Sequence, residues 1–180
     1  MRFTILDRLI SSDRLFYFQH ISMSDNSFVY EPVDASNLKI GIVAASYNME
    51  LTTELLNRTS DSLREHGLQE ENLVVTRVPG SFEIPVVAHE MAQSGKFHSV
   101  IALGVVIAGD TSHHELIGQT TGQSLLQIST QTRTPMINGI LVVNNLQQAE
   151  DRITGKQNRG PEFAQAALHM SSLKHSWNNS

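Results

Sequence analysis

The chain has 180 residues, of which 40% are hydrophobic and 17% are charged, and its net charge is -5. This length and composition suit one globular domain. The negative net charge does not indicate the basic surface that binds nucleic acid. The absence of cysteine excludes disulfides, thiolate metal sites and cysteine nucleophiles. No apolar run approaches the roughly 20 residues of a membrane-spanning helix. From the acidic charge and the short apolar runs we expect neither nucleic acid nor a membrane as a partner.

The first 37 residues lack the regular pattern of the remainder. They contain no continuous apolar segment with a small-residue cleavage site, so no secretory signal is indicated and we expect a cytoplasmic protein. We interpret residues 1–37 as a partly disordered N-terminal extension, in which residues 1–22 are dispensable and Met23 is an alternative start. Residues 27–32 (SFVYEP) alternate between apolar and polar side chains, as an edge strand added to a neighbouring subunit would.

Residues 38–176 form one predicted domain in which strands and helices alternate. Short apolar runs predict strands at 38–45, 72–78, 98–109 and 135–143. Helical periodicity predicts helices at about 49–66, 81–95 and 112–132, and two more that begin near Gln147 and Pro161. The side chains expected to face the core from these helices are Leu51, Leu55, Leu63, Ile84, Val87, Ala88, Met91, Leu116, Leu125, Ile128, Phe163, Ala166, Ala167 and Met170.

Four residues mark the ends of the first two helices. Gly67 and Gly95 are typical of the position just after a helix. Ser81 can cap the second helix, and Pro85 falls in its first turn, where the missing N–H costs little.

Alternating strands and helices predict a parallel sheet with helices on both faces. In such sheets ligands bind beyond the carboxyl ends of the strands. Polar segments follow each predicted strand in turn: ASYN (45–48), VPGSFEIP (78–85), AGDTSHH (108–114) and the Asn144–Asn145 pair. The sequence therefore predicts a binding site where these segments gather.

The segment GDTSHH (109–114) offers two kinds of chemistry. Backbone N–H groups beside Gly109 and at the start of a helix attract phosphate or another anion. His113 and His114 are candidates for proton transfer, although each could equally be a solvated surface histidine. Neither HHELI (113–117) nor HEMAQ (89–93) has a second histidine four residues after its first, so we expect no metal site.

Three motifs together resemble the 6,7-dimethyl-8-ribityllumazine synthase (lumazine synthase) family. They are VPGSFEIP, GVVIxGxTxH (104–113), and NGILVVNNLQQAEDR (138–152) followed by K…NRG, and the resemblance covers about 38–175. It implies a flavodoxin-like three-layer α/β/α sandwich with a four-stranded parallel sheet. It also implies condensation of 5-amino-6-(D-ribitylamino)uracil with 3,4-dihydroxy-2-butanone 4-phosphate, releasing phosphate and water in riboflavin biosynthesis.

The resemblance further implies an assembly. The family forms pentamers, sometimes packed into 60-subunit shells, with each active site between adjacent subunits, and it uses no metal or redox cofactor. Riboflavin synthase is a further candidate partner.

The resemblance also assigns roles to single residues. The ring of Tyr47 would stack on the pyrimidine, Ser81, Phe82 and Glu83 would bind the ribityl chain and pyrimidine, and Val106 and Ile107 would line the pyrimidine pocket. Asp110, through its backbone N–H, and Thr111 would hold the phosphate end of the butanone, His113 would transfer protons, and Arg152 would pair with the phosphate. Tyr47 could instead seal the core, Glu83 could favour the start of a helix, and Arg152 could be a surface residue of a helix.

Three features depart from the family pattern: two single residues and one loop. His114 replaces a usual Tyr or Phe, and Asn138 replaces a Phe that often packs on the pyrimidine of a neighbouring subunit. The loop after Arg152 is one residue shorter, and Arg159 replaces a frequent lysine. The first two departures bear on ring stacking and affinity, and the third bears on the assembly state. Asn138 leaves open a non-catalytic homologue that binds flavin or lumazine. A protein that only forms the shell is a further alternative, against which the presence of both His113 and Arg152 speaks.

Overall fold

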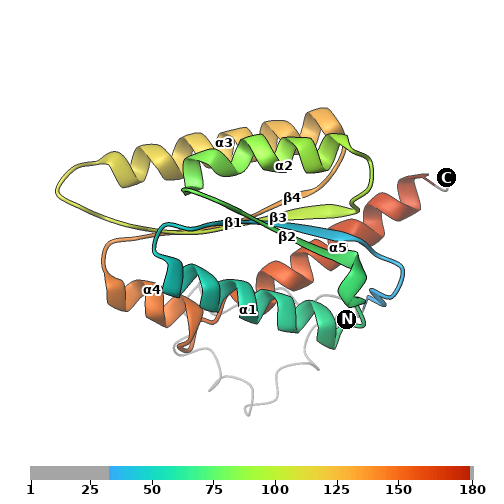
Figure 1. Ribbon diagram of the computed structural model, residues 1–180, viewed down its shortest axis with the longest axis horizontal. Coiled ribbons are helices and arrows are strands. Elements are labelled where there is room, and N and C mark those ends of the chain that lie inside the picture. The colour runs from blue at the N-terminus through green and yellow to red at the C-terminus, as the bar shows by residue number, and fades with distance from the viewer. Residues whose placement is uncertain (1–32, 179–180) are drawn as a thin grey trace, which may run out of the picture.

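The computed structural model describes residues 33–178 (Figure 1). The predicted edge strand at 27–32 and the segment 1–22 lie outside the described residues. In chain order the elements are β1 (Ile40–Ala45), α1 (Met49–Glu65), η3 (Glu70–Asn72), β2 (Leu73–Val78), η4 (Ser81–Glu83), α2 (Ile84–Gln93), β3 (Ser99–Ile107), α3 (His113–Thr132), β4 (Met136–Val143), α4 (Leu146–Ile153) and α5 (Gly160–Asn178).

The four strands form one parallel sheet in the order β2-β1-β3-β4. Helices α2 and α3 cover one face, and α1, α4 and α5 cover the other (Figure 1). The predicted flavodoxin-like α/β/α sandwich is therefore confirmed. Chain connections leave β1 and β3 toward opposite edges of the sheet, so the carboxyl ends of these two strands flank the position where such sheets bind ligands.

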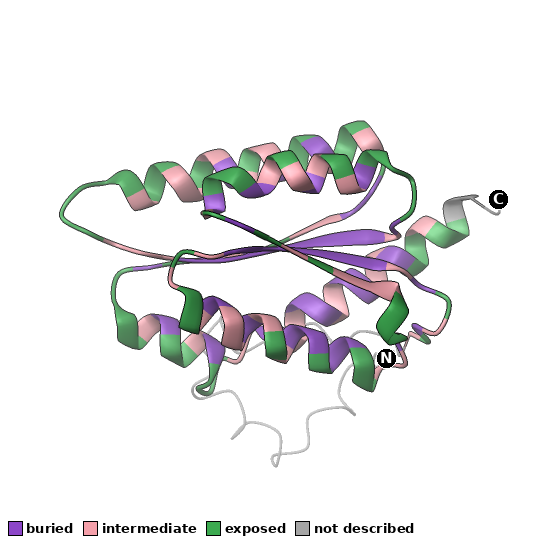
Figure 2. Ribbon diagram, in the orientation of Figure 1, coloured by how far each residue is buried: buried purple, intermediate pink, exposed green. Residues whose placement is uncertain are grey.

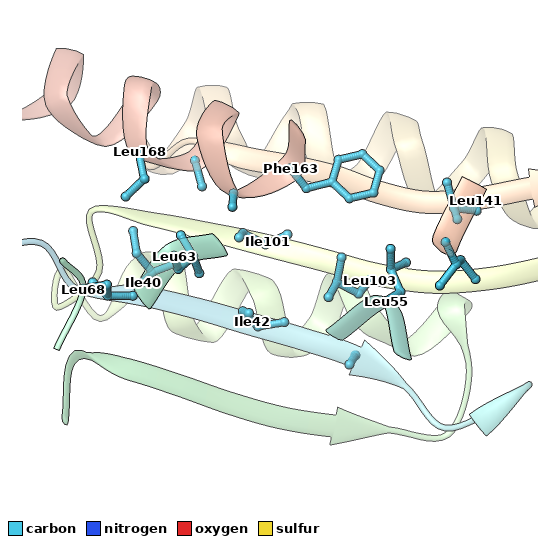
Figure 3. Packing of buried hydrophobic residues seen from close by; sticks show 14 of the residues in the cluster. Ile40, Ile42, Leu55, Leu63, Leu68, Ile101, Leu103, Leu141, Phe163 and Leu168 are labelled. Atoms are coloured by element: carbon cyan, nitrogen blue, oxygen red, sulfur yellow. The ribbon is translucent and has the colours of Figure 1, made fainter. Parts of the chain in front are cut away.

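The hydrophobic core has one part on each face of the sheet. On one face, side chains of β1 and β3 such as Ile42 and Leu103 pack against Leu55 of α1 and Leu168 of α5 (Figure 3). On the other, Val43 and Val100 belong to a cluster with Leu125 of α3 and Ala88 of α2. Because these strands are buried on both faces (Figure 2), they read as continuous apolar runs.

The predicted helix ends at Gly67 and Gly95 are confirmed. Both glycines have positive φ, 92° and 68°, which only glycine adopts without strain. Just after α1, the Leu68 N–H donates to the Leu63 carbonyl at 3.2 Å and the Gly67 N–H to the Arg64 carbonyl at 2.8 Å. Pro85 falls in the first turn of α2, as predicted.

Two local predictions were wrong. Leu116 is 55% exposed, because it precedes the buried Leu125 by nine residues, which is half a turn away around a helix. Ser81 does not cap α2: it begins the 3₁₀ turn η4, and α2 follows Glu83 without a side-chain cap.

The face of α5 that packs on the core is rotated slightly from the predicted one. Phe163 and Ala167 are buried as expected, whereas Ala166 and Met170 are half-buried. Ala164 and Leu168 take the remaining core positions.

Residues just before β1 also pack on the core. Ala35 is fully buried, and its N–H donates to the His66 carbonyl at 3.1 Å. Val33 lies against the same cluster. Packing on the core thus extends several residues before the first strand.

Candidate active site

A cavity of about 470 Å³ opens at the carboxyl ends of β1 and β3. Its lining includes eight residues predicted for the site, namely Tyr47, Ser81, Phe82, Glu83, Val106, Ile107, Thr111 and His113. The segments that follow three different strands therefore meet in one place, as parallel strands require. The volume lies within the usual range for small-molecule pockets.

Backbone hydrogen bonds beyond the end of β1 hold the first wall of this cavity. The Tyr47 N–H donates to the Pro79 carbonyl at 3.0 Å, which keeps Tyr47 beside the segment that leads to Phe82. Asn48 has left-handed backbone angles, and its Nδ2 donates to the Val105 carbonyl of β3 at 2.9 Å. The rings of Tyr47 and Phe82 are 73% and 59% exposed, so their faces are available to a flat ligand.

Ser81 lies at the buried end of the cavity. It is 7% exposed and packs directly on Gly104 of β3, where an added Cβ would overlap the serine Oγ. A glycine at this position lets the 81–83 turn approach the strand. The side chain of Glu83 turns back toward Gly80, whose ideal Cβ would lie 3.0 Å from Glu83 Oε2.

The segment 109–114 contributes Gly109, Thr111, His113 and His114 to the lining and ends in the first turn of α3. The Ser112 carbonyl accepts from the N–H groups of Glu115 and Leu116 at 3.1 and 3.3 Å, so the helical bonds begin there. The preceding N–H groups have no partner within the helix and suit an anion. His113 is exposed, and His114 Nδ1 lies 3.0 Å from the Thr111 carbonyl, which favours the tautomer that carries a proton on Nδ1.

The cavity does not include the other three predicted residues. Asp110 is exposed between Gly109 and Thr111. Asn138 lies on β4 beneath α3, where its Oδ1 accepts from the Ile140 N–H at 3.2 Å.

The third residue outside the cavity, Arg152, lies on α4. This helix covers the sheet face opposite α3 (Figure 1). The Nη1 of Arg152 donates to the Gln148 carbonyl at 3.1 Å. Within residues 33–178, the lining of the cavity contains no lysine or arginine.

Several lining residues were not predicted as site residues: Gly80, Val105, Gly109, His114 and Ile117. Gly109 was predicted to make a turn beside anion-binding N–H groups, and His114 was a proton-transfer candidate at a position where the family usually has Tyr or Phe. Ile117 could have been found, because it follows His113 by four residues and so shares its helix face.

The family model for 6,7-dimethyl-8-ribityllumazine synthase matches residues 37–175. The chain belongs to the lumazine synthase family. A 6,7-dimethyl-8-ribityllumazine synthase from Thermococcus gammatolerans is 41% identical to it over 136 residues, which are 76% of this chain and 87% of the relative. The crystal structure of SulA from Pseudomonas aeruginosa matches with a TM-score of 0.37 and 13% identity, over 63% of this chain and 81% of that one, too weakly to bear on fold or function.

These matches confirm the predicted family and its activity, the synthesis of the lumazine in riboflavin biosynthesis. In the described part of this lumazine synthase homologue, no group of three potential His, Asp or Glu ligands could hold a metal ion. No helix there is both long and apolar enough to cross a membrane. The pentamer, the partner enzyme and the cytoplasmic location stay predictions.

Proposed function

We propose that the cavity beyond β1 and β3 is where this lumazine synthase condenses 5-amino-6-(D-ribitylamino)uracil with 3,4-dihydroxy-2-butanone 4-phosphate. Tyr47 and Phe82 present ring faces to the pyrimidine, with Val106 and Ile107 beside it. Ser81 and Glu83 bind the ribityl chain and pyrimidine. The observation that carries the proposal is the convergence of predicted residues from three strand ends on one cavity.

The start of α3 takes the phosphate in this proposal. Thr111 and the backbone N–H of Asp110 would hold it beside the first turn of the helix, where the N–H groups and the helix dipole favour an anion. The side chain of Asp110 is exposed, and in this proposal it turns away from the phosphate.

The reaction needs no strong nucleophile from the protein, which has only to orient the two substrates and transfer protons. The aromatic amine attacks the ketone and one water leaves to give an imine, phosphate is then eliminated, and ring closure releases a second water. Holding both reactants in near-attack geometry can supply roughly 7–11 kcal/mol of the barrier in the best cases. His113 would move protons, and its loss should lower the rate roughly 10–10³-fold, in the lower part of the range for general acid–base catalysis.

A second copy of the chain completes the site in this proposal. A phosphate dianion calls for a guanidinium, yet the lining supplied by one chain has no lysine or arginine among the described residues. Arg152 and Asn138 lie outside that cavity, and we propose that a neighbouring subunit of a pentamer contributes both. The exposed Tyr47 and Phe82 are then covered by that neighbour. A 60-subunit shell, riboflavin synthase as a partner and a cytoplasmic location are extensions of the same proposal.

Steady-state kinetics with each substrate varied in turn test these roles. Arg152→Ala should raise KM for the butanone phosphate about 30-fold or more, since a charge-assisted contact contributes about 2–4 kcal/mol. KM for the uracil should change little. His113→Ala should lower kcat roughly 10–10³-fold and leave both KM values within a few-fold.

The outcome that contradicts the assignment is an unchanged phosphate-substrate KM in Arg152→Ala, or an equal rise in His113→Ala. The unmodified protein provides the control for the non-catalytic alternative. If it binds the lumazine but shows no increase of lumazine absorbance with both substrates, the chain is a binding protein and the proposal fails.

A further inference from the structure

The loop 154–159, which follows α4, satisfies the end of that helix completely. The last four carbonyl groups of a helix have no partner within it. In α4 three of them accept backbone hydrogen bonds from this loop: Glu150 from the Thr154 N–H at 2.8 Å, Asp151 from the Gln157 N–H at 3.2 Å, and Arg152 from the Arg159 N–H at 2.8 Å. The fourth, Ile153, accepts from Asn158 Nδ2 at 3.0 Å when the Asn158 amide is oriented to satisfy both of its neighbours. The backbone of Arg152 is therefore fixed by the loop that follows it.

The Asn158 side chain links this loop to α1. With its amide turned to satisfy both neighbours, Nδ2 donates to the Ile153 carbonyl and Oδ1 accepts from Arg58 Nη1 at 3.2 Å. These two bonds replace a single 3.3 Å bond from the Gly160 N–H in the opposite amide orientation. Asn158 thus connects Arg58 of α1 to the carbonyl of Ile153, the residue that follows Arg152.

Arg58 is itself held on two sides. Its Nε donates to Glu54 Oε1 at 2.7 Å, one turn earlier on α1, and its side chain is only 34% exposed. The start of α5 packs directly on it: an ideal Cβ on Gly160 would lie 2.7 Å from Arg58 Cβ and 3.1 Å from the Thr59 nitrogen. A glycine at 160 thus lets the end of the loop lie against α1 at Arg58.

We propose that Arg58 is a positioning residue for Arg152. By orienting Asn158, it fixes the end of α4 and so the point from which the Arg152 guanidinium reaches the phosphate. This inference rests on the proposed phosphate contact of Arg152. It makes Arg58, which is not among the residues that line the cavity, a determinant of affinity for one substrate and not the other.

The test compares Arg58→Ala with a matched control on the same helix. Arg64 also forms ion pairs, with Asp61 and Glu70 at 3.1 and 2.7 Å, but it contacts neither the loop nor α4 in these bonds. Arg58→Ala should raise KM for the butanone phosphate roughly 3- to 20-fold, less than Arg152→Ala, because only an indirect restraint is lost. KM for the uracil should stay within two-fold, and Arg64→Ala should change neither.

A double variant separates positioning from a general loss of structure. In the Arg152→Ala background the Arg58→Ala change should have no further effect on phosphate-substrate KM. If Arg58→Ala does not fold, Asn158→Asp serves instead, because it keeps an acceptor for Arg58 but loses the donor to Ile153. It should give the same selective rise in KM.

Three results would overturn the inference. One is an equal rise of both KM values, and another is an effect of Arg58→Ala that persists in full without Arg152. The third is an unchanged KM in Arg58→Ala beside a raised KM in Arg152→Ala, which leaves the proposed function intact. An unchanged KM in Arg152→Ala itself would instead remove the phosphate role of Arg152, and this inference with it.

Discussion

Gly104 offers a way to move one atom of the candidate site without disturbing the fold. It lies on β3, and an alanine there would place its Cβ on the Oγ of Ser81. The next nearest atoms, the Cβ atoms of Ser81 and Ala45, would be 3.5 and 3.7 Å away, which is ordinary contact. Only the serine hydroxyl must therefore move, and it can do so by rotation to another staggered rotamer.

Gly104→Ala should consequently change stability by less than about 1 kcal/mol, since the rotamer change is cheap and alanine lowers the entropy cost of folding. The displaced Oγ should lose its bond to the ribityl chain or pyrimidine. A neutral hydrogen bond contributes about 0.5–1.5 kcal/mol, which corresponds to a roughly 2- to 13-fold rise in KM for the ribitylaminouracil. Urea unfolding and steady-state kinetics measure the two quantities.

Gly139 of the neighbouring strand β4 provides the matched control. An added Cβ there would lie 2.8 Å from the Ala102 carbonyl oxygen and 3.1 Å from Phe163 Cδ2. The carbonyl belongs to the central strand and cannot rotate away, so Gly139→Ala should destabilise the protein by roughly 1–3 kcal/mol and leave KM unchanged. If Gly104→Ala lost as much stability as Gly139→Ala, the argued rotation of the Ser81 hydroxyl would be refuted. If it kept its KM for the uracil, the placement of Ser81 in the site would be refuted.

Two further predictions concern pH and assembly. Burial and the positive charge of Lys174 lower the pKa of His98, whose Nδ1 accepts the Lys39 N–H at 2.8 Å. As the pH falls, the His98 imidazole therefore takes up a proton in the unfolded chain before it does so in the folded one. The contribution of His98 to the free energy of unfolding should be fully present above about pH 6.5 and be lost as the pH drops from there toward the folded pKa. His98→Asn keeps an acceptor for the Lys39 N–H and should flatten this pH dependence in unfolding measurements. Activity should disappear together with the oligomer in an ultracentrifugation dilution series, whereas an active monomer would contradict the contribution of Arg152 by a second subunit.

The sequence by itself determined the class of fold and most of the cavity. Strands such as β3 carry no polar alternation because both of their faces are buried, so the apolar runs located all four strands and implied the parallel arrangement. Parallel strands end at one edge, and this rule alone is enough to place Tyr47, Ser81, Thr111 and His113 together. The motifs at those same strand ends were also the ones that resembled the family.

Only the tertiary structure decided which side chains come into contact around the cavity and between the helices. The core face of α3 depends on the rotation of the helix against the sheet, and a nine-residue separation turns Leu116 away from it. The contact between Arg58 and Asn158 joins residues far apart in the chain, and no local pattern encodes it. The position of Arg152 on α4, outside the cavity, also became known only from the structure. Local periodicity fixes which elements form, but the packing of whole layers fixes which side chains meet, because those contacts depend on the relative placement of elements distant in the chain.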